Sequence, residues 1–477
     1  MTNFIARESE IQKLQEIAES KDPSITVVYG RRRVGKTTLI EHALSHKRIL
    51  TIEGLEKQTK RKQIQHVLDQ ISIAVKEPEI MKLQYKSWKE IFIKISEYLI
   101  GSKKKYDIVY FEEVQWLANY KTEFAAELKY VWDQILRKIP GLMVILCGSS
   151  PSFMLQKIIR SKALYNRSEH IISVKPFNLS DTYKYFQGKK SFKEVLDAYL
   201  FVGGIPEYLR YLKKDSSVQL AIANNSFKSD SFFVNEYEKI FTSSLADNPE
   251  YKKIVKILAA TPHLFRQEIS KKLGKIAGGT LSVWLEDLEI CGFISSYTPP
   301  DAKSKTFLKK YYIADPYLHF YYKFIEPIKK EIDRGDFAKN PLTCLSPKKL
   351  PSYLGYAFER FCIEKSRDIA ATLGFNAVEY RAGPYFRRGD KDTSGAQVDL
   401  CFLRKDKVAT LCEIKYQNFV ISKEVIKEMD SKLEVFNSDR DLQSYSVEKV
   451  LISVGKVQDG LLGYFNRILK AEDIWST

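Results

Sequence analysis

Short apolar runs alternate with helical patterns through residues 1–179. The apolar runs lie at residues 25–29, 106–111 and 142–148, and each is followed by small or charged residues. Runs of this length are typical of buried strands in a parallel sheet, and the stretches between them are long enough for helices that cover the sheet. The pattern therefore predicts an α/β domain at residues 1–179.

The hydrophobic pattern changes three times beyond this domain. Residues 180–245 carry Tyr and Phe at helical spacing and predict a helical lid with an aromatic core. Residues 246–325 show three helical patterns followed by two strand-like runs, the order of a winged helix-turn-helix. Residues 326–350 contain three prolines, many charges and little periodicity, and predict a linker before a last domain at residues 351–477.

The expected winged helix carries basic residues on two segments. Its third helix is expected to begin at Thr280 and to face a nucleic-acid groove. Acidic residues in that helix favour an alternative, a structural or regulatory module, because they repel phosphate. The basic residues are Lys271, Lys272 and Lys275 beside the third helix and Lys303, Lys305, Lys309 and Lys310 on the wing, and the acidic ones are Glu286, Asp287 and Glu289.

Composition narrows the class of protein. The 477 residues are 44% hydrophobic, and the six cysteines form no CxxC pair and no Cys/His ligand spacing, so neither a disulfide framework nor a zinc site is expected. No uncharged apolar run approaches the roughly 18 residues of a membrane-spanning helix, and the N-terminus lacks a signal-peptide pattern. We therefore expect a cytoplasmic protein that does not use a membrane.

The net charge of +17 favours a polyanionic partner. Nucleic acid is a better candidate than a membrane surface because no basic amphipathic segment stands out.

A phosphate-binding motif follows the first apolar run. Gly30 and Gly35 frame the spacing GxxxxGK[ST], in which backbone N–H groups curl around an anion at a helix N-terminus. Lys36 is expected to reach the β- and γ-phosphates of ATP, and Thr37 to bind Mg²⁺. The residues expected to hold the nucleotide here are Gly30, Arg33, Gly35, Lys36, Thr37 and Thr38.

The second apolar run ends in two carboxylates, Glu112 and Glu113. Parallel strands deliver their last residues to the edge of the sheet where nucleotide binds, so Glu112 is expected to hold Mg²⁺ and Glu113 to polarise the attacking water. The alternative is a solvated strand end. The third apolar run ends at Ser149, which could sense the γ-phosphate.

These motifs resemble the archaeal-type AAA ATPases, relatives of the STAND signalling NTPases. The opening segment FIARESEIQKL is similar to the family's entry box, which places Arg7 near the adenine, although Ala6 stands where the family usually has glycine. The family usually has Asp where this chain has Glu112. The resemblance implies an ATP-binding P-loop NTPase core.

The same resemblance assigns roles to three further residues. Ser149 matches the serine that senses the γ-phosphate. Arg167 matches an arginine that stabilises phosphate charge, either in its own subunit or across to a neighbouring one. Action across subunits would imply a homo-oligomer. Asn166 replaces the family's glycine before that arginine. Pro206 lies in a GGxP element whose proline packs against the base.

Two strand-like runs near the C-terminus carry a second group of charged residues. Asp399 lies in one run, and Glu413 and Lys415 lie in the next, on one face because strand side chains alternate. Two carboxylates can share Mg²⁺ while a lysine assists the attacking water or the leaving group, the components of phosphodiester cleavage. The alternative is a surface hairpin in which Asp399 caps a turn.

This arrangement resembles the PD-(D/E)xK nucleases over residues 351–477. The resemblance implies that Asp399 and Glu413 are metal ligands. It also implies that Glu359 on the first helix and Lys415 belong to the catalytic site. The expected fold class is therefore α/β: a P-loop NTPase core with a helical lid, a winged helix domain and a C-terminal α/β restriction-endonuclease-like domain.

Together these features predict an ATP-gated enzyme that acts on nucleic acid, DNA rather than RNA, with ATP and Mg²⁺ as cofactors. The alternative is a nucleotide-gated regulatory switch that binds DNA or a protein partner without cleaving it.

Overall fold

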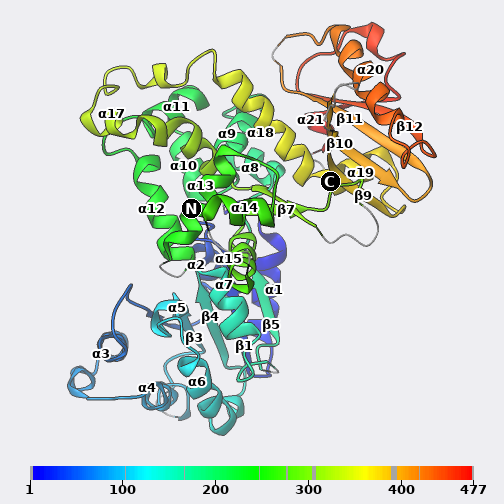
Figure 1. Ribbon diagram of the computed structural model, residues 1–477. Helices are drawn as coiled ribbons and strands as arrows, with labels where there is room; N and C mark the ends of the chain where they lie inside the picture. The colour runs from blue at the N-terminus through cyan, green and yellow to red at the C-terminus, as the bar shows by residue number, and fades with distance from the viewer. Residues whose placement is uncertain are drawn as a thin grey trace. The chain divides into compact units, whose positions relative to one another are not determined.

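The computed structural model describes residues 4–101, 104–165, 167–245, 248–274, 278–302, 308–387, 395–417 and 419–474. The chain divides into two compact units, labelled by element in Figure 1. The first unit comprises Met1–Phe177, Ile205–Glu207 and Glu238–Asn248, and the second comprises Asn178–Gly204, Tyr208–Tyr237 and Pro249–Thr477.

A five-stranded parallel sheet forms the centre of the first unit, in the order β2-β3-β4-β1-β5. Because every strand runs in the same direction, all their carboxyl ends meet at one edge. The strands are β1 Ser24–Tyr29, β2 Ile49–Glu53, β3 Ile108–Glu112, β4 Met143–Gly148 and β5 His170–Ser173.

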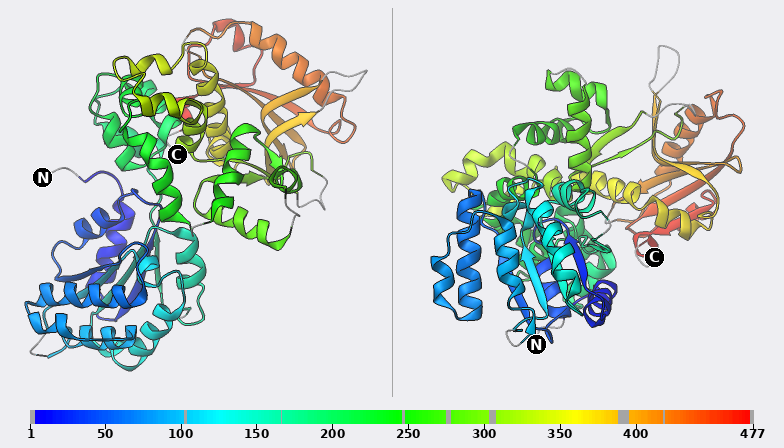
Figure 2. Two further views of the ribbon diagram at one scale, coloured as in Figure 1. Left: turned by 60° about the vertical axis from the view of Figure 1, so that its left-hand side comes forward. Right: turned by 90° about the horizontal axis from the view of Figure 1, so that it is seen from below.

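Helices cover both faces of this sheet (Figures 1 and 2). Alternate residues of the three central strands enter two separate cores: Val28 packs with the first two helices, whereas Val27 packs with the third, fourth and sixth. The helices are α1 Glu8–Glu19, α2 Lys36–Ala43, α3 Lys60–Val75, η1 Pro78–Lys82, α4 Trp88–Ser96, α5 Val114–Leu117, α6 Glu123–Gln134, η3 Leu136–Lys138, α7 Pro151–Phe153 and η4 Met154–Ile159.

Residues 180–245 are helical, with an aromatic centre. Tyr208 contacts Phe233 and Tyr317 at ring separations of 5.7 and 5.5 Å. The helices of this region and of the segment that packs with it are α8 Leu179–Phe186, α9 Phe192–Val202, α10 Pro206–Leu212, α11 Val218–Asn224, α12 Phe232–Ser244, α16 Pro316–Phe320 and η5 Tyr321–Ile325.

Residues 249–313 combine three helices with a small antiparallel sheet of order β6-β8-β7. The third helix begins at Gly279, next to the predicted start at Thr280. The elements are α13 Pro249–Ala260, β6 Leu264–Phe265, α14 Arg266–Leu273, α15 Gly279–Ile290, β7 Ile294–Tyr297 and β8 Lys310–Ile313. Lys271 and Lys272 lie on α14, and Lys309 precedes β8, whereas Lys275, Lys303 and Lys305 lie outside the described residues.

The expected linker at residues 326–350 differs from an extended connection. It contains η6 Glu326–Ile328, α17 Lys329–Arg334 and η7 Pro341–Cys344. Ile332 and Leu345 are buried within the second unit. These apolar side chains fix the segment to the unit despite its prolines and charges.

A mixed five-stranded sheet of order β13-β12-β11-β10-β9 occupies the C-terminal part of the second unit. β9, β10 and β11 are antiparallel, whereas β11, β12 and β13 are parallel. The strands are β9 Tyr380–Arg387, β10 Ala396–Arg404, β11 Val408–Lys415, β12 Ser446–Ser453 and β13 Arg467–Lys470. The helices are α18 Leu350–Glu364, α19 Ser366–Leu373, α20 Glu424–Asn437, η8 Asp459–Leu461 and α21 Ala471–Ile474, and α18 and α20 pack on the sheet.

None of the helices in the described part of the chain has the length and hydropathy needed to span a membrane.

Candidate functional site

The turn between β1 and α2 depends on two glycines. A Cβ atom at Gly30 would lie 2.2 Å from the carbonyl oxygen of Val174, so no larger residue fits without movement of the backbone. Gly35 has φ 88° immediately before α2, a left-handed conformation that glycine adopts without strain. Both glycines of the motif are therefore required by the backbone of the turn.

Lys36 is the first residue of α2, and its ammonium group lies within the same turn. Its Nζ donates to the carbonyl oxygens of Gly30 and Arg31, both at 3.1 Å, and the residue is 7% exposed. The turn thus holds one buried positive charge at a helix N-terminus, where anions bind favourably.

The end of β3 meets the start of α2 through Thr37 and Glu112. The Thr37 hydroxyl donates to Glu112 Oε1, although the two residues are 75 positions apart. A hydroxyl and a carboxylate are oxygen ligands of the kind that Mg²⁺ prefers, so the pair fits the predicted ion. The structure brings together the two residues that the sequence assigns to Mg²⁺ beside the P-loop.

Glu113 is held by the end of the neighbouring strand β4. Its Oε2 accepts hydrogen bonds from the Ser149 backbone N at 3.1 Å, from Ser149 Oγ at 2.6 Å and from Gln115 Nε2 at 2.6 Å. Glu113 itself has φ 53°, a strained conformation for a residue with a side chain, and such strain is common at functional sites. The arrangement fixes one carboxylate oxygen beside the predicted γ-phosphate sensor.

A third carboxylate lies at the same edge of the sheet. Glu53 ends β2 and pairs in register with Glu112. Burial raises the pKa of Glu53, and the charges of Glu112 and Glu113 raise it further. Its signal in the sequence is an acidic residue that ends an apolar run at 49–52, as Glu112 does in β3.

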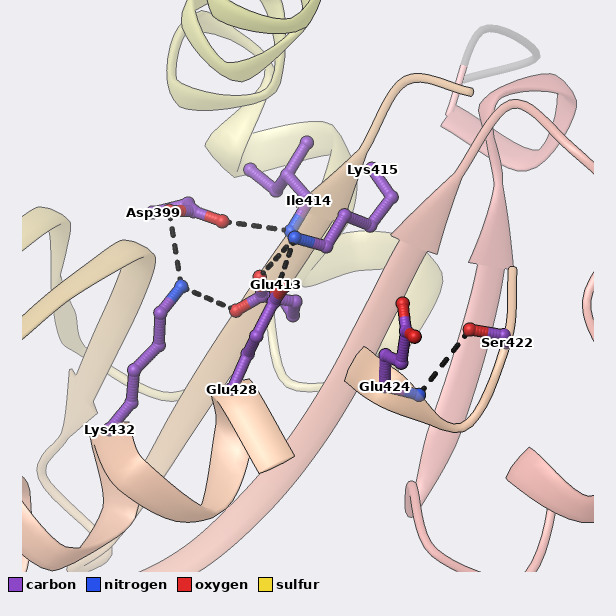
Figure 3. A network of polar contacts seen from close by, with 8 residues as sticks. All are labelled: Asp399, Glu413, Ile414, Lys415, Ser422, Glu424, Glu428 and Lys432. Carbon is purple, nitrogen blue, oxygen red and sulfur yellow. Dashed lines mark hydrogen bonds and ion pairs between the residues drawn. The ribbon is translucent and has the colours of Figure 1, made fainter. Parts of the chain in front are cut away.

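The second charged cluster centres on Asp399, which lies where β10 is irregular. The pairing of β10 with β9 shifts by one residue between Val398 and Cys401, which marks a β-bulge. Bulges bend a strand and re-aim side chains, and they are frequent beside functional sites. Asp399 Oδ2 accepts a hydrogen bond from the Ile414 backbone N at 3.0 Å, which joins β10 to β11 (Figure 3).

Lys432 of α20 lies between the two carboxylates of this cluster (Figure 3). Its Nζ is 2.5 Å from Glu413 Oε2 and 3.5 Å from Asp399 Oδ1. Glu413 is 1% exposed and Asp399 is 8% exposed. A buried carboxylate pair needs a counter-charge, and here an ammonium group provides it.

Lys415 completes the cluster. Its Nζ lies 3.0 Å from Glu413 Oε1 and 2.5 Å from Glu428 Oε2, so α20 also binds the lysine of the predicted motif. Across the described residues no group of three His, Cys, Asp or Glu side chains has a geometry able to hold a metal ion. The cluster therefore consists of the carboxylates of Asp399 and Glu413 with the ammonium groups of Lys415 and Lys432 paired to them.

Electrostatics extend the cluster to Glu359 of α18. Burial raises the pKa of Asp399 to about 6, and repulsion by Glu413 adds to the rise. Burial raises the pKa of Glu359 to about 8, and the charges of Asp399 and Glu413 add to it. Burial also lowers the pKa of Lys415, but Glu413 and Glu428 outweigh it, so that this pKa is raised. The four residues taken from the nuclease resemblance therefore share one electrostatic environment.

Residues 4–212 match the model of a protein family described as an ATPase domain predominantly from Archaea. This match supports an archaeal-type P-loop ATPase domain in the first part of the chain. Residues 321–429 match a second family model, described as archaeal and bacterial proteins of unknown function. The uncharacterized protein MJECL04 of Methanocaldococcus jannaschii is 26% identical over 431 residues, which are 87% of this chain and 88% of that protein.

Two solved structures are similar at lower identity. The Walker-type ATPase paby2304 of Pyrococcus abyssi is 21% identical with a TM-score of 0.47, covering 67% of this chain and 96% of that one. The ORC2 protein of Aeropyrum pernix, in its ADPNP–ADP complexes, is 15% identical with a TM-score of 0.47, covering 71% and 98%.

Arg7, predicted to lie near the adenine, has contacts with the backbone of the ATPase domain. It has φ 73°, and its Nη2 donates to the carbonyl oxygens of Lys175 at 2.6 Å and Val34 at 3.2 Å. Arg7 thereby ties the P-loop to the segment after β5. Its contact with a nucleotide stays a prediction.

Four other residues were predicted to act on the nucleotide, and two of them, Arg33 and Arg167, form ion pairs within the protein. Arg33 lies 3.9 Å from Glu207. Arg167 forms two bonds of 2.8 Å to the carboxylate of Asp133 on α6. Pro206 is the first residue of α10, and Thr38 is exposed on α2. The roles of Arg33, Thr38, Arg167 and Pro206 toward ATP stay predictions, and Asn166 lies outside the described residues.

Proposed function

We propose that this chain hydrolyses ATP to act on nucleic acid, and that the Asp399–Glu413 cluster cleaves phosphodiester bonds with Mg²⁺. The observation that supports the ATP step best is the meeting of three strand ends at the P-loop, with Thr37 bonded to Glu112 and Glu113 bonded to Ser149.

At the ATPase site each residue has a chemical task. Lys36 leaves its contacts with the loop carbonyls to neutralise the β- and γ-phosphates, and Thr37 with Glu112 would hold Mg²⁺. Glu113 orients the attacking water through the carboxylate that Ser149 and Gln115 fix in place. Mg²⁺ supplies positive charge to the phosphate oxygens when bound.

Lys36→Ala and Glu113→Gln test this assignment. Lys36→Ala is expected to weaken binding of labelled ATP, whereas Glu113→Gln is expected to bind ATP and lose phosphate release. Glu41→Gln, on the exposed side of α2, is the matched control. Phosphate release by Glu113→Gln at the rate of the parent would remove Glu113 from the mechanism.

Action on nucleic acid is supported by the net charge of +17 and by the helix and strand order of residues 249–313. We assign this segment as a winged helix. Charge reversal at Lys271 and Lys272 is expected to reduce the steep salt dependence of DNA binding if α14 contacts the phosphate backbone. An unchanged salt slope would move the contact to another surface.

Cleavage is supported by the convergence of Asp399, Glu413 and Lys415. The two carboxylates would hold Mg²⁺, which would supply an activated water molecule, and Lys415 would offset charge that develops on the phosphate. Asp399→Ala is expected to abolish Mg²⁺-dependent cutting and to leave ATP hydrolysis unchanged. Exposed Asp459→Ala is the control. Substrates are linear, circular and single-stranded DNA and RNA, each with ATP, with a non-hydrolysable analogue and without nucleotide.

A second candidate function is a nucleotide-gated switch that binds without cutting. The position of Lys432 favours it, because an ammonium group already neutralises the pair that Mg²⁺ would need. A parent protein that binds DNA and hydrolyses ATP but cuts none of these substrates would support the switch. Cutting that is equal in the parent and in Asp399→Ala would place the activity elsewhere.

A further inference from the structure

The second unit contains a cavity of about 830 Å³, and Glu359 is the one residue of the Asp399–Glu413 cluster that lines it. Its walls come from α13, α14, β8, η5, α18 and β9, all within that unit. This volume lies in the range of about 300–1,000 Å³ typical of small-ligand and cofactor sites. The cavity is large enough for a ligand with both a ring system and a charged group.

Positive charge dominates the lining. Five cationic side chains and three glutamates line the cavity. One of the lysines, Lys256, forms an ion pair of 2.7 Å with one of those glutamates, Glu326. The Arg387 guanidinium donates to the Val435 carbonyl and to Ser438 Oγ, which are uncharged. A ligand in this cavity therefore meets an excess of positive charge.

Arg360 of α18 has unsatisfied donors at the cavity. Its Nε and Nη1 are buried and have no hydrogen-bond partner among the described residues. Glu364 interacts with this guanidinium electrostatically but accepts no bond from these two nitrogens. A guanidinium stays charged at every physiological pH, and its fork matches the oxygens of a phosphate. Phosphate would supply the acceptors that the protein does not.

Two uncharged histidines add hydrogen-bonding groups. Burial lowers the pKa of His263 to about 4, with the nearby Lys310 and Arg360 lowering it further, and burial lowers the pKa of His319 well below its usual value. Nδ1 of each ring is buried without a partner in the part of the chain that the structure describes. His263 also has φ 60°, a conformation found at functional sites. Neutral imidazoles can donate to or accept from a nucleobase.

Aromatic rings line the same space. Lys310 lies over the rings of Phe265 and Phe386 at 5.1 and 4.8 Å, and the His319 ring stacks on Tyr353 at 5.1 Å. Tyr356 is 60% exposed and lies one helical turn before Arg360, on the same face of α18. Among these rings Tyr356 is the exposed one, and an exposed aromatic ring beside a cation is a feature that binds nucleic-acid bases by stacking.

We infer that this cavity binds a nucleoside phosphate, with the phosphate on Arg360 and the base among the surrounding aromatic rings. The ligand is a free nucleotide or one unit of a nucleic-acid strand. Glu359 lines the cavity and also interacts with Asp399 and Glu413, so a bound strand would border that cluster. The inference rests on the proposed action on nucleic acid and names where a nucleotide unit of the substrate binds.

The test measures binding to the full chain in EDTA, where no cleavage occurs. The Lys36→Ala background removes the contribution of the P-loop, and the probes are fluorescent oligothymidylate and thymidine monophosphate. Arg360→Gln is expected to weaken binding by about tenfold or more, because a charge-assisted bond to phosphate is lost. Tyr356→Ala is expected to weaken it by about fivefold or more, because a stacking platform is lost.

Arg367→Gln, an exposed arginine of α19, is the matched control and is expected to change affinity by less than about twofold. Competition by the monophosphate at similar affinity identifies a free nucleotide as the ligand, and binding of the oligonucleotide alone identifies a strand. Exposed Tyr356 can be replaced without opening a core, so its variant keeps the test valid if Arg360→Gln fails to fold.

Equal affinity of the parent and Tyr356→Ala for both probes would overturn the inference, as would no measurable binding by the parent. The outcomes for cleavage are separate. If binding depends on Arg360 but the protein cuts nothing, the cavity is supported and the nuclease is rejected. If the protein cuts and its binding does not depend on Arg360 or Tyr356, the nuclease is supported and the cavity is rejected.

Discussion

Replacing Lys432 with alanine is expected to destabilise the second unit in EDTA. The ammonium lies 2.5 Å from Glu413 and 3.5 Å from Asp399, and its side chain is 18% exposed. Removing one partner of a buried ion pair costs about 3–5 kcal/mol, because the remaining charge is left uncompensated. The lower end, about 3 kcal/mol, applies here because the freed carboxylates can share a proton.

Mg²⁺ is expected to reverse most of that loss. A divalent cation present at about 100 times its dissociation constant stabilises the folded state by about 2.7 kcal/mol. The assay is urea unfolding of the parent and of Lys432→Ala, each in EDTA and in increasing Mg²⁺. Lys427→Ala removes an exposed lysine from the same helix and controls for lost positive charge.

The decisive quantity is the difference in Mg²⁺ stabilisation between Lys432→Ala and the other two proteins. Any Mg²⁺ effect at the P-loop is common to all three and cancels in this difference. If Mg²⁺ stabilises all three proteins equally, Lys432 does not compete with a cation for Asp399 and Glu413; if it stabilises none of them, the proposed nuclease chemistry has no metal to use.

Three further predictions follow from single contacts. Gly30→Ala would place a Cβ atom 2.2 Å from the Val174 carbonyl oxygen, so ATP affinity measured by dialysis should fall about tenfold, whereas Gly279→Ala, which meets nothing within 4 Å, should leave it unchanged. The pKa of His263 is lowered to about 4 from about 6.5 in the unfolded chain, so its stabilising effect is present above pH 6.5 and is lost as the pH falls toward 4. The parent should therefore lose up to about 3 kcal/mol more than His263→Asn over that range in urea unfolding, and parallel curves would contradict this. Arg167→Ala should slow phosphate release and Asp133→Ala should not if Arg167 acts on phosphate, whereas equal rates would leave the ion pair a purely structural contact.

The ATPase site was largely predictable because its parts are local in sequence. A strand, a glycine turn and a helix follow one another at residues 24–43. The backbone of the turn requires glycine at Gly30 and Gly35, so the motif has a strict spacing that can be recognised in the sequence. The meeting of Thr37 with Glu112 follows from parallel strands, whose ends share one edge. The carboxylate of Glu53 follows the same rule, but no motif spacing singles it out.

Lys432 and Glu428 were not predictable in the same way. They are a Glu–Lys pair four positions apart on a helix, a pattern typical of solvated helices. Only tertiary packing of α20 against the sheet brings them to Asp399, Glu413 and Lys415. The short helices of residues 326–350 were not predictable for a related reason, because prolines and charges outnumber the buried Ile332 and Leu345 that hold the segment in place.

The hydrogen bond from the Ile414 backbone N to Asp399 gives that carboxylate a structural role in the sheet. The regular ladder between β10 and β11 begins at Leu400 and Cys412, and the Asp399 side chain supplies the next rung in place of a backbone carbonyl. Evolutionary retention of an acid here can therefore reflect selection for sheet pairing alone. Lys415 supplies no such rung, so among relatives its presence or loss is the better marker of whether the cluster is under selection for chemistry.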